Sequence, residues 1–202
     1  VLPGRNLGPL FHNQREVEQI GQAVAGKAFL GNLATEATFR QESEQFQVLH
    51  LAMHAVLDDK DPLRSCLVFT PEAEQGPQPE RTDGMLHAYE IYHLPLEAEL
   101  AVLSACHSGE GDFRPGEGLV SLGRAFAYAG CANTVMSLWQ ADDAAAATLM
   151  AQFYHYLAAG LPKDEALRQA RLDYLATEDL AHPHFWGNFV LFGDGEPVEV
   201  KP

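Results

Sequence analysis

The feature that most constrains the fold is a series of short apolar runs separated by helical patterns. The runs cover residues 47–54, 99–106 and 134–139. Short runs that are apolar throughout are typical of strands buried on both faces of a parallel sheet. Strands that alternate with helices predict an α/β domain around a mainly parallel sheet, and right-handed crossovers then place helices on both faces.

Helices and minor strands are expected around these three runs. Thr35 is a plausible N-cap, Gly130 and Gly160 are expected to end helices, and Asp142 with Asp143 suits a helix N-terminus. The helices are expected at 16–25, 35–45, 119–129, from 142 to 160 and at 161–176, and further short strands at 27–30, 67–70 and 189–192.

The length of 202 residues is enough for one sizeable core. The chain does not start with Met, and we expect it to be a piece of a longer protein. We predict a linker over 1–15, one domain over 16–195 and a tail over 196–202. No apolar run reaches about 18 residues and no secretory signal opens the chain, so we expect no membrane span.

The charge and the cysteines narrow the class of protein. A net charge of −15 argues against a protein that contacts nucleic acid directly, since phosphate binding needs a basic surface. That acidity either attracts basic segments or only keeps the domain dispersed. Three cysteines without paired spacing favour a reducing, cytoplasmic compartment over a disulfide framework. No Cys/His cluster has zinc spacing, so no metal or cofactor is expected.

Reactive or charged residues stand where the three apolar runs end. His54 ends the first, Cys106 ends the second, and Asp142 with Asp143 follows the third. In an open parallel sheet, ligands bind beyond the carboxyl ends of the strands. If the three strands are neighbours, these residues converge on one edge of the sheet.

A cysteine and a histidine at such an edge are suited to nucleophilic catalysis. A thiol attacks as thiolate, and a nearby imidazole can take its proton. Cys106 runs into a Gly-rich loop, and the backbone N–H groups of Ala55 and Cys106 are candidates for an oxyanion hole. The alternative is that Cys106 is a small buried residue at a strand end, and position alone leaves both open. The separation of His54 from Cys106, 52 residues, is close to the caspase spacing of about 50.

Five collinear segments resemble the CHAT domain, a family of caspase-like peptidase domains similar to the catalytic domain of separase. The segments are HLAMHA (50–55), LSACHSGEG (103–111), GEGLVSLGRAFAYAGC (116–131), SLWQADD (137–143) and HPHFWGNFVLFGD (182–194). The resemblance implies a caspase-like three-layer sandwich. It also implies that His54 and Cys106 are the catalytic pair.

The resemblance further implies an acidic S1 pocket that accepts Arg or Lys. Asp143 is the first candidate for its acid and Asp142 the second, with a helix cap as the alternative for either. Two positions depart from the family pattern. Ala55 replaces the usual Gly, which is the more permissive residue. His107 follows the cysteine, where we expect a solvated side chain.

Several other residues are candidates for a structural role as well as for a functional one. We expect His50 to pack or hydrogen-bond beneath the site, and Trp139 to lie near the pocket wall. Ser104 and Ser137 are candidates to line the cleft. His182 and His184 have a spacing that metals use but lack a third ligand in the sequence. We expect Trp186 in the core, and Cys66 and Cys131 as buried thiols.

The predicted function is a cysteine endopeptidase that cleaves protein substrates after Arg or Lys and is regulated by partner domains or proteins. Family members often follow tetratricopeptide repeats, which would lie upstream of Val1. The main alternative is a catalytically silent regulatory or scaffolding domain. A thiol hydrolase or transferase acting on a small acyl substrate is a second alternative.

Overall fold

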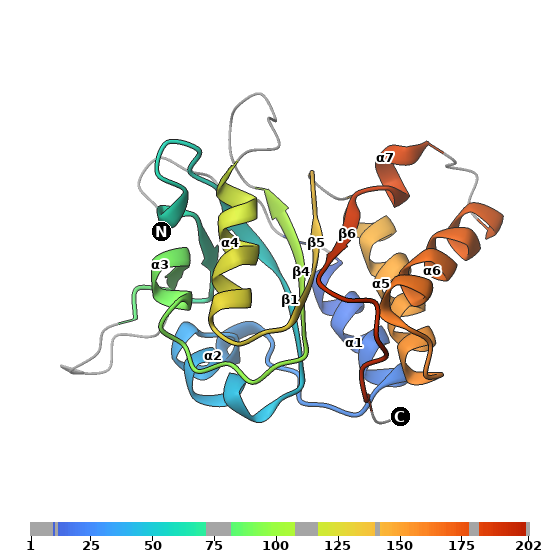
Figure 1. The fold of residues 1–202 in the computed structure, drawn as a ribbon, viewed down its shortest axis with the longest axis horizontal. Helices are drawn as coiled ribbons and strands as arrows, with labels where there is room; N and C mark the ends of the chain where they lie inside the picture. The colour runs from blue at the N-terminus through green and yellow to red at the C-terminus, as the bar shows by residue number, and fades with distance from the viewer. Residues whose placement is uncertain are drawn as a thin grey trace.

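The computed structural model describes residues 10, 12–71, 82–107, 117–139, 142–177 and 182–200, with only the backbone at 105–107, 117, 119 and 177. Within these ranges a six-stranded sheet has the order β3-β2-β1-β4-β5-β6 (Figure 1). The strands are β1 (Val48–Val56), β2 (Cys66–Val68), β3 (Met85–His87), β4 (Leu100–His107), β5 (Asn133–Ser137) and β6 (Phe189–Phe192).

The three expected main strands are the centre of the sheet. β4 pairs in parallel with β1 on one side and with β5 on the other. The flanking pairs, β1 with β2, β2 with β3 and β5 with β6, are antiparallel. The α/β architecture is therefore confirmed, and its parallel part consists of the strands that carry the candidate site residues.

Helices cover both faces of the sheet. On one face lie α1 (Asn13–Ala23), α5 (Asp143–Ala158) and α6 (Lys163–Thr177), and on the other lie α2 (Glu36–Glu42), α3 (Ala88–Ile91) and α4 (Glu117–Tyr128) (Figure 1). A short helix, α7 (Pro183–Trp186), precedes β6, and single 3₁₀ turns span Gly31–Leu33, Ser43–Gln45 and Pro62–Arg64.

The side chains of β4 explain why its first four residues, 100–103, are all apolar. Leu100 and Val102 are fully buried in the core beneath α5, whereas Ala101 and Leu103 are buried in the core beneath α4. A strand covered on both faces has no solvent side, so the alternation of apolar and polar residues disappears.

The expected helix boundaries are largely confirmed. Thr35 caps α2, because its side chain accepts the N–H of Thr38 at 3.1 Å. Gly130 follows α4 at φ 111°. A Cβ there would lie 2.0 Å from the Leu96 carbonyl oxygen, so both the backbone and the space require glycine. Gly160 follows α5 at φ 83°.

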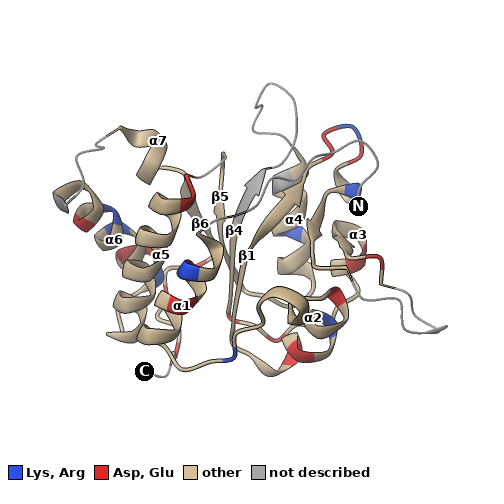
Figure 2. Ribbon diagram, turned by 180° about the vertical axis from the view of Figure 1, so that it is seen from behind, with Lys and Arg blue, Asp and Glu red and all other residues tan. Residues whose placement is uncertain are grey.

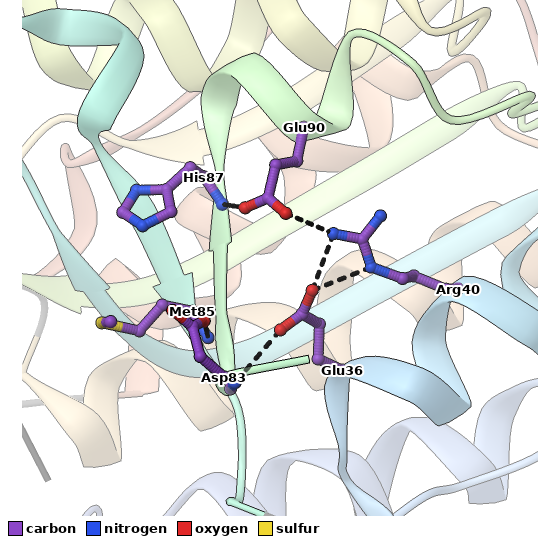
Figure 3. Close-up of polar contacts among 7 residues, drawn as sticks. Glu36, Arg40, Asp83, Met85, His87 and Glu90 are labelled. Atoms are coloured by element: carbon purple, nitrogen blue, oxygen red, sulfur yellow. Dashed lines mark hydrogen bonds and ion pairs between the residues drawn. The ribbon is translucent and has the colours of Figure 1, made fainter. Parts of the chain in front are cut away.

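A charged network ties α2 to the segment of β3 and α3, elements the sequence pattern did not predict (Figure 3). Arg40 bridges Glu36 at 2.7 Å and Glu90 at 2.7 Å. Glu36 also accepts the N–H of Gly84 at 3.1 Å, and Glu90 accepts the N–H of His87 at 3.0 Å. These contacts fix a three-residue strand that is too short to show a hydrophobic period.

The strand expected at 27–30 is not formed. Residues 25–30 form neither a helix nor a ladder with any described strand. At the other end of the chain, Val198 is 3% exposed and packs into the core with α5 and α6. Acidic residues are found in helices on both faces of the sheet (Figure 2).

Candidate functional site

The register of β1 and β4 brings two of the expected residues to one level of the sheet. His54 and Cys106 are Cα partners in the parallel ladder, one position before its last pair, Ala55 with His107. Neighbouring strands lie about 4.8 Å apart, so the two Cα atoms are close neighbours. Both positions are at the carboxyl ends of their strands, which is the edge where ligands bind in sheets of this kind.

The two side chains are described to different extents. The ring of His54 is half-buried. Only the backbone of residues 105–107 is described, so the thiol of Cys106 and the ring of His107 lie outside the described atoms. The positions of the strands, rather than a distance between side-chain atoms, define this candidate pair.

A buried polar cluster centres on His50, which lies four residues before His54 on β1. Nε2 of His50 lies 3.0 Å from Oε1 of Glu16, and Nδ1 of His50 lies 3.3 Å from the hydroxyl of Tyr154. Glu16 is 3% exposed and Tyr154 is 1% exposed. Burial raises the pKa of the Tyr154 hydroxyl, with the Glu16 carboxylate adding to the shift. The contacts fasten α1 and α5 to β1, as expected for a structural His50.

The two aspartates after β5 have different surroundings. The carboxylate of Asp142 accepts the N–H of Ala145 at 3.0 Å and caps α5 while exposed to solvent. Asp143 is half-buried and lines a small cavity of about 10 Å³ together with Ser104, Glu16 and Asn13. Ser104 lies on β4 two positions before Cys106, and of the two aspartates Asp143 is the one that shares a cavity with it.

Ala55 lies in regular strand backbone. It is 1% exposed and pairs with Leu67 of β2 and with His107 of β4. Among the described residues, no residue other than glycine has a positive φ. Alanine is therefore accommodated here, because extended backbone makes no demand for glycine.

Side chains after β5 hold the segment that leads to the aspartates. Ser137 is 1% exposed, donates its hydroxyl to the Trp139 carbonyl and accepts from Asn188 at 3.2 Å. The indole N–H of Trp139 donates to the His184 carbonyl at 3.0 Å, and the two rings stack at 6.4 Å. Ser137 is thus a structural residue, and the contact between Trp139 and His184 joins the end of β5 to α7.

The surroundings of Cys66, Cys131 and His182 indicate structural roles for these three residues. Cys66 and Cys131 are buried, as expected. Burial raises the pKa of the Cys131 thiol to about 11, which makes it inert at neutral pH. His182 caps α7 through its ring, and Trp186 packs at the margin of the core. In the part of the chain that the structure describes, no three His, Cys, Asp or Glu side chains are grouped for a metal ion.

The sequence reasoning did not identify Glu16 and Tyr154 as partners of His50. A pointer was present, because Glu16 lies four residues before Ile20 and therefore shares the apolar face of α1. A carboxylate on a buried face predicts a polar partner in the core.

None of the described helices has the length and apolar character needed to cross a membrane.

Known proteins similar to this chain contain tetratricopeptide repeats. Tetratricopeptide repeat protein 28 of Mus musculus is 24% identical over 217 residues, which cover 92% of this chain and 9% of that protein. The Homo sapiens protein of the same name is 24% identical over 92% of this chain and 8% of its own length. The chain therefore spans less than a tenth of these relatives. The CHAT domain profile matches residues 4–194. This chain belongs to the CHAT domain family.

Proposed function

We propose that this CHAT domain is a cysteine endopeptidase that cleaves protein substrates after Arg or Lys. The observation that carries the proposal is the register of β1 and β4, in which His54 and Cys106 are paired positions at the carboxyl edge of the parallel sheet. An imidazole and a thiol at adjacent strand ends suit proton transfer from the sulfur, which makes the attacking thiolate.

The proposed reaction has two halves. The thiolate of Cys106 attacks the carbonyl carbon of the peptide bond, the C–N bond breaks, and the imidazolium of His54 gives its proton to the departing amine. Water then attacks the thioester, His54 takes a proton from that water, and the carboxylate product leaves as the thiol is restored. This sequence needs no metal and no redox partner.

Asp143 is proposed as the acid that binds the basic side chain before the cleaved bond. Its half-buried carboxylate shares a small cavity with Ser104, two positions before Cys106. Asp142 is occupied as the cap of α5. A desolvated carboxylate near a strand end attracts a guanidinium or ammonium group through a charge-assisted hydrogen bond.

Regulation by partner domains is part of the proposal. The ladder of β1 and β4 continues past the candidate pair to Ala55 and His107. Backbone N–H groups inside a ladder are used between strands. The N–H of Ala55 lies on the side of β1 that faces β4, so the last pair of this ladder has to separate before that N–H can face an oxyanion. A partner that stabilises the separated form would activate the domain.

A catalytically silent regulatory or scaffolding domain is the second candidate. The closed ladder end favours it, because the N–H of Ala55 is directed toward β4, not toward a substrate, as long as Ala55 and His107 stay paired. Tetratricopeptide repeats upstream of Val1 are proposed as the partner domains in either case. This rests on the relatives, whose names state such repeats.

Cleavage of fluorogenic peptides that differ only in the P1 residue tests the proposal. The chain and the longer natural polypeptide are each assayed with Arg, Ala and Asp at P1, beside Cys106→Ala and, as a control for the loss of a thiol, Cys66→Ala. We expect cleavage after Arg that Cys106→Ala lowers by about 10⁴-fold or more and Cys66→Ala does not abolish. Equal cleavage by Cys106→Ala would refute the assignment, and no cleavage by any form would favour the silent domain.

A further inference from the structure

A cavity of about 980 Å³ lies along the edge of β1 that faces away from β4. One wall is β1 itself, over residues 48–54, and the opposite wall is the extended segment 24–31. Ile20 of α1 and Phe39 of α2 also line it. Those two side chains belong to the cores on opposite faces of the sheet, so the cavity lies in the plane of the sheet.

The β1 wall presents hydrogen-bonding groups of the backbone. The carbonyl of Gln47 accepts from Leu100 of β4, and alternate residues of a parallel strand bond to the same neighbour. The N–H and C=O groups of Val48, His50 and Ala52 therefore point away from β4, into the cavity. Among the described residues, the contact to this row is the side-chain amide of Asn13, which donates to the Ala52 carbonyl at 3.5 Å.

β2 leaves this part of the edge uncovered. It pairs with β1 only over His54, Ala55 and Val56. The chain then turns away, since Phe69 donates to the Gly84 carbonyl and Thr70 to the Ala34 carbonyl, each through its backbone N–H. The open length of β1 is six residues, or roughly 20 Å, which is the length of an ordinary strand.

Both ends of the opposite wall have the backbone angles of a strand. Val24 has φ −135° and ψ 142°, and Leu30 has φ −122° and ψ 153°. Lys27 pairs with Glu42 at 2.9 Å, and the Gly31 carbonyl accepts the Thr70 hydroxyl at 2.9 Å. A segment with strand angles at both ends, anchored in this way and lining the same cavity as β1, can pair with a strand placed between them. This also explains why 27–30 resembles a strand in sequence.

We propose that this cavity receives one β-strand, contributed by a segment that precedes Val1 in a longer polypeptide. The strand would lie between β1 and residues 24–30 and pair with both. Backbone groups kept from water without partners cost free energy, and a strand is the structure that satisfies a row of them along a sheet edge. The apolar side chains from both cores require apolar residues on both faces of this strand.

The origin of the strand follows from composition and chain path. Three longer segments of the chain that are not described, 1–9, 72–81 and 108–116, are poor candidates, because each contains proline and glycine and proline lacks the N–H donor that a central strand needs. Leu10 and Asn13 line the cavity, so the chain passes its mouth just before α1. A strand followed by α1 and then by 24–30 forms a β-α-β unit, whose strands are parallel.

Hydrogen exchange tests this inference without reference to peptidase activity, so its failure is separate from that of the proposed function. The amides of Val48, His50 and Ala52 are compared in the 1–202 polypeptide and in a polypeptide extended by roughly 30 residues before Val1, enough for a strand and its connection. We expect exchange at these amides to slow by about 100-fold or more in the extended polypeptide. The amides of Leu49 and Leu51, which face β4, serve as the internal reference and change little.

A pair of substitutions in the extended polypeptide keeps the test decisive. Phe29→Lys places a charge in the cavity and is expected to return exchange at Val48, His50 and Ala52 to the rate seen in the 1–202 polypeptide. Leu63→Lys changes an apolar side chain that is 47% exposed and outside the cavity, and should leave these rates unchanged. Equal exchange in both polypeptides would overturn the inference. Protection of the 1–202 polypeptide that grows with protein concentration would also overturn it and identify a second copy as the occupant.

Discussion

His54 and Cys106 are directly paired positions on neighbouring parallel strands, separated by 52 positions in sequence and by one strand spacing in space. Such a pairing fixes the relative height of the two residues through the backbone ladder, not through flexible side chains. Side chains at paired positions of neighbouring strands lie on the same face of the sheet, so this register is compatible with the proposed proton transfer.

Replacement of His54 tests the proton-transfer role directly. His54→Asn keeps a polar side chain of similar reach but removes the titrating imidazole, so we expect kcat/KM for a peptide with Arg at P1 to fall about 10³-fold or more. His50→Asn is the matched control for loss of an imidazole on the same strand. It should lower the free energy of unfolding, because Glu16 and Tyr154 lose their partner, while residual folded protein keeps cleaving. Equal losses of kcat/KM in the two variants would contradict the assignment.

The neighbouring aspartates provide a second matched pair. Asp143→Asn is expected to lower kcat/KM about 10- to 100-fold for Arg at P1 and much less for Ala at P1, since a charge-assisted contact contributes about 1.5–3 kcal/mol. Asp142→Ala should instead lower the free energy of unfolding by about 1 kcal/mol through loss of the α5 cap, with the P1 preference unchanged. A change of P1 preference in Asp142→Ala alone would reverse the two roles.

The parts of the fold that sequence predicts are those with local causes. The apolar run of β4 predicts its burial, and Thr35 and Gly130 mark helix ends through their own side chain or its absence. The register that pairs His54 with Cys106 depends on which strands are neighbours. No pattern within a single strand predicts its neighbours, so the convergence of the two residues is expected only if β1 and β4 are adjacent. The division of Asp142 and Asp143 into cap and cavity residue depends on the direction of α5, which no pattern of two like residues reveals.

The elements that the sequence patterns did not predict depend on partners far away along the chain. β3 exists because it pairs with β2 and because Glu36 and Glu90 accept N–H groups on either side of it (Figure 3). Residues 27–30 show the converse, since a β-compatible sequence has no ladder partner among the described residues. Strand formation is a property of two segments together, so a pattern in one segment is insufficient.

The ion-pair network around Arg40 should be important for stability. Glu36 is 2% exposed, and Arg40→Ala would leave its charge buried without the guanidinium. We expect a loss of about 2–4 kcal/mol in the free energy of unfolding, measured by urea titration. Arg64→Ala is the control, because its exposed pair with Asp61 contributes less than about 1 kcal/mol.

A second substitution separates charge from packing in this network. Glu36→Gln in the Arg40→Ala background removes the buried charge while its amide oxygen still accepts the N–H of Gly84. The double variant is therefore expected to be more stable than Arg40→Ala alone. If the double variant is less stable by the sum of both losses, the carboxylate charge is not the cause.

Thiol labelling should distinguish Cys106 from the two buried cysteines. The pKa of Cys131 is raised to about 11 by burial, so at pH 8 only about one molecule in a thousand carries its thiolate. Iodoacetamide at pH 8 is expected to label Cys106 first, with Cys131 modified only after urea is added. Peptide mass spectrometry reads out the order, and rapid labelling of Cys131 in the native protein would contradict its burial.

The raised pKa of Cys131 also predicts that the free energy of unfolding decreases at alkaline pH. A thiol in an unfolded chain has a pKa of about 8.5, and the folded pKa of Cys131 is raised to about 11. The folded state therefore holds a proton that the unfolded state releases between these values, and the stabilisation present below pH 8.5 is lost as pH rises through that window. Urea titrations at pH 8 and pH 10.5 measure it. The decrease between the two pH values should be smaller in Cys131→Ala than in the natural protein, and an equal decrease would show that other groups cause the alkaline loss.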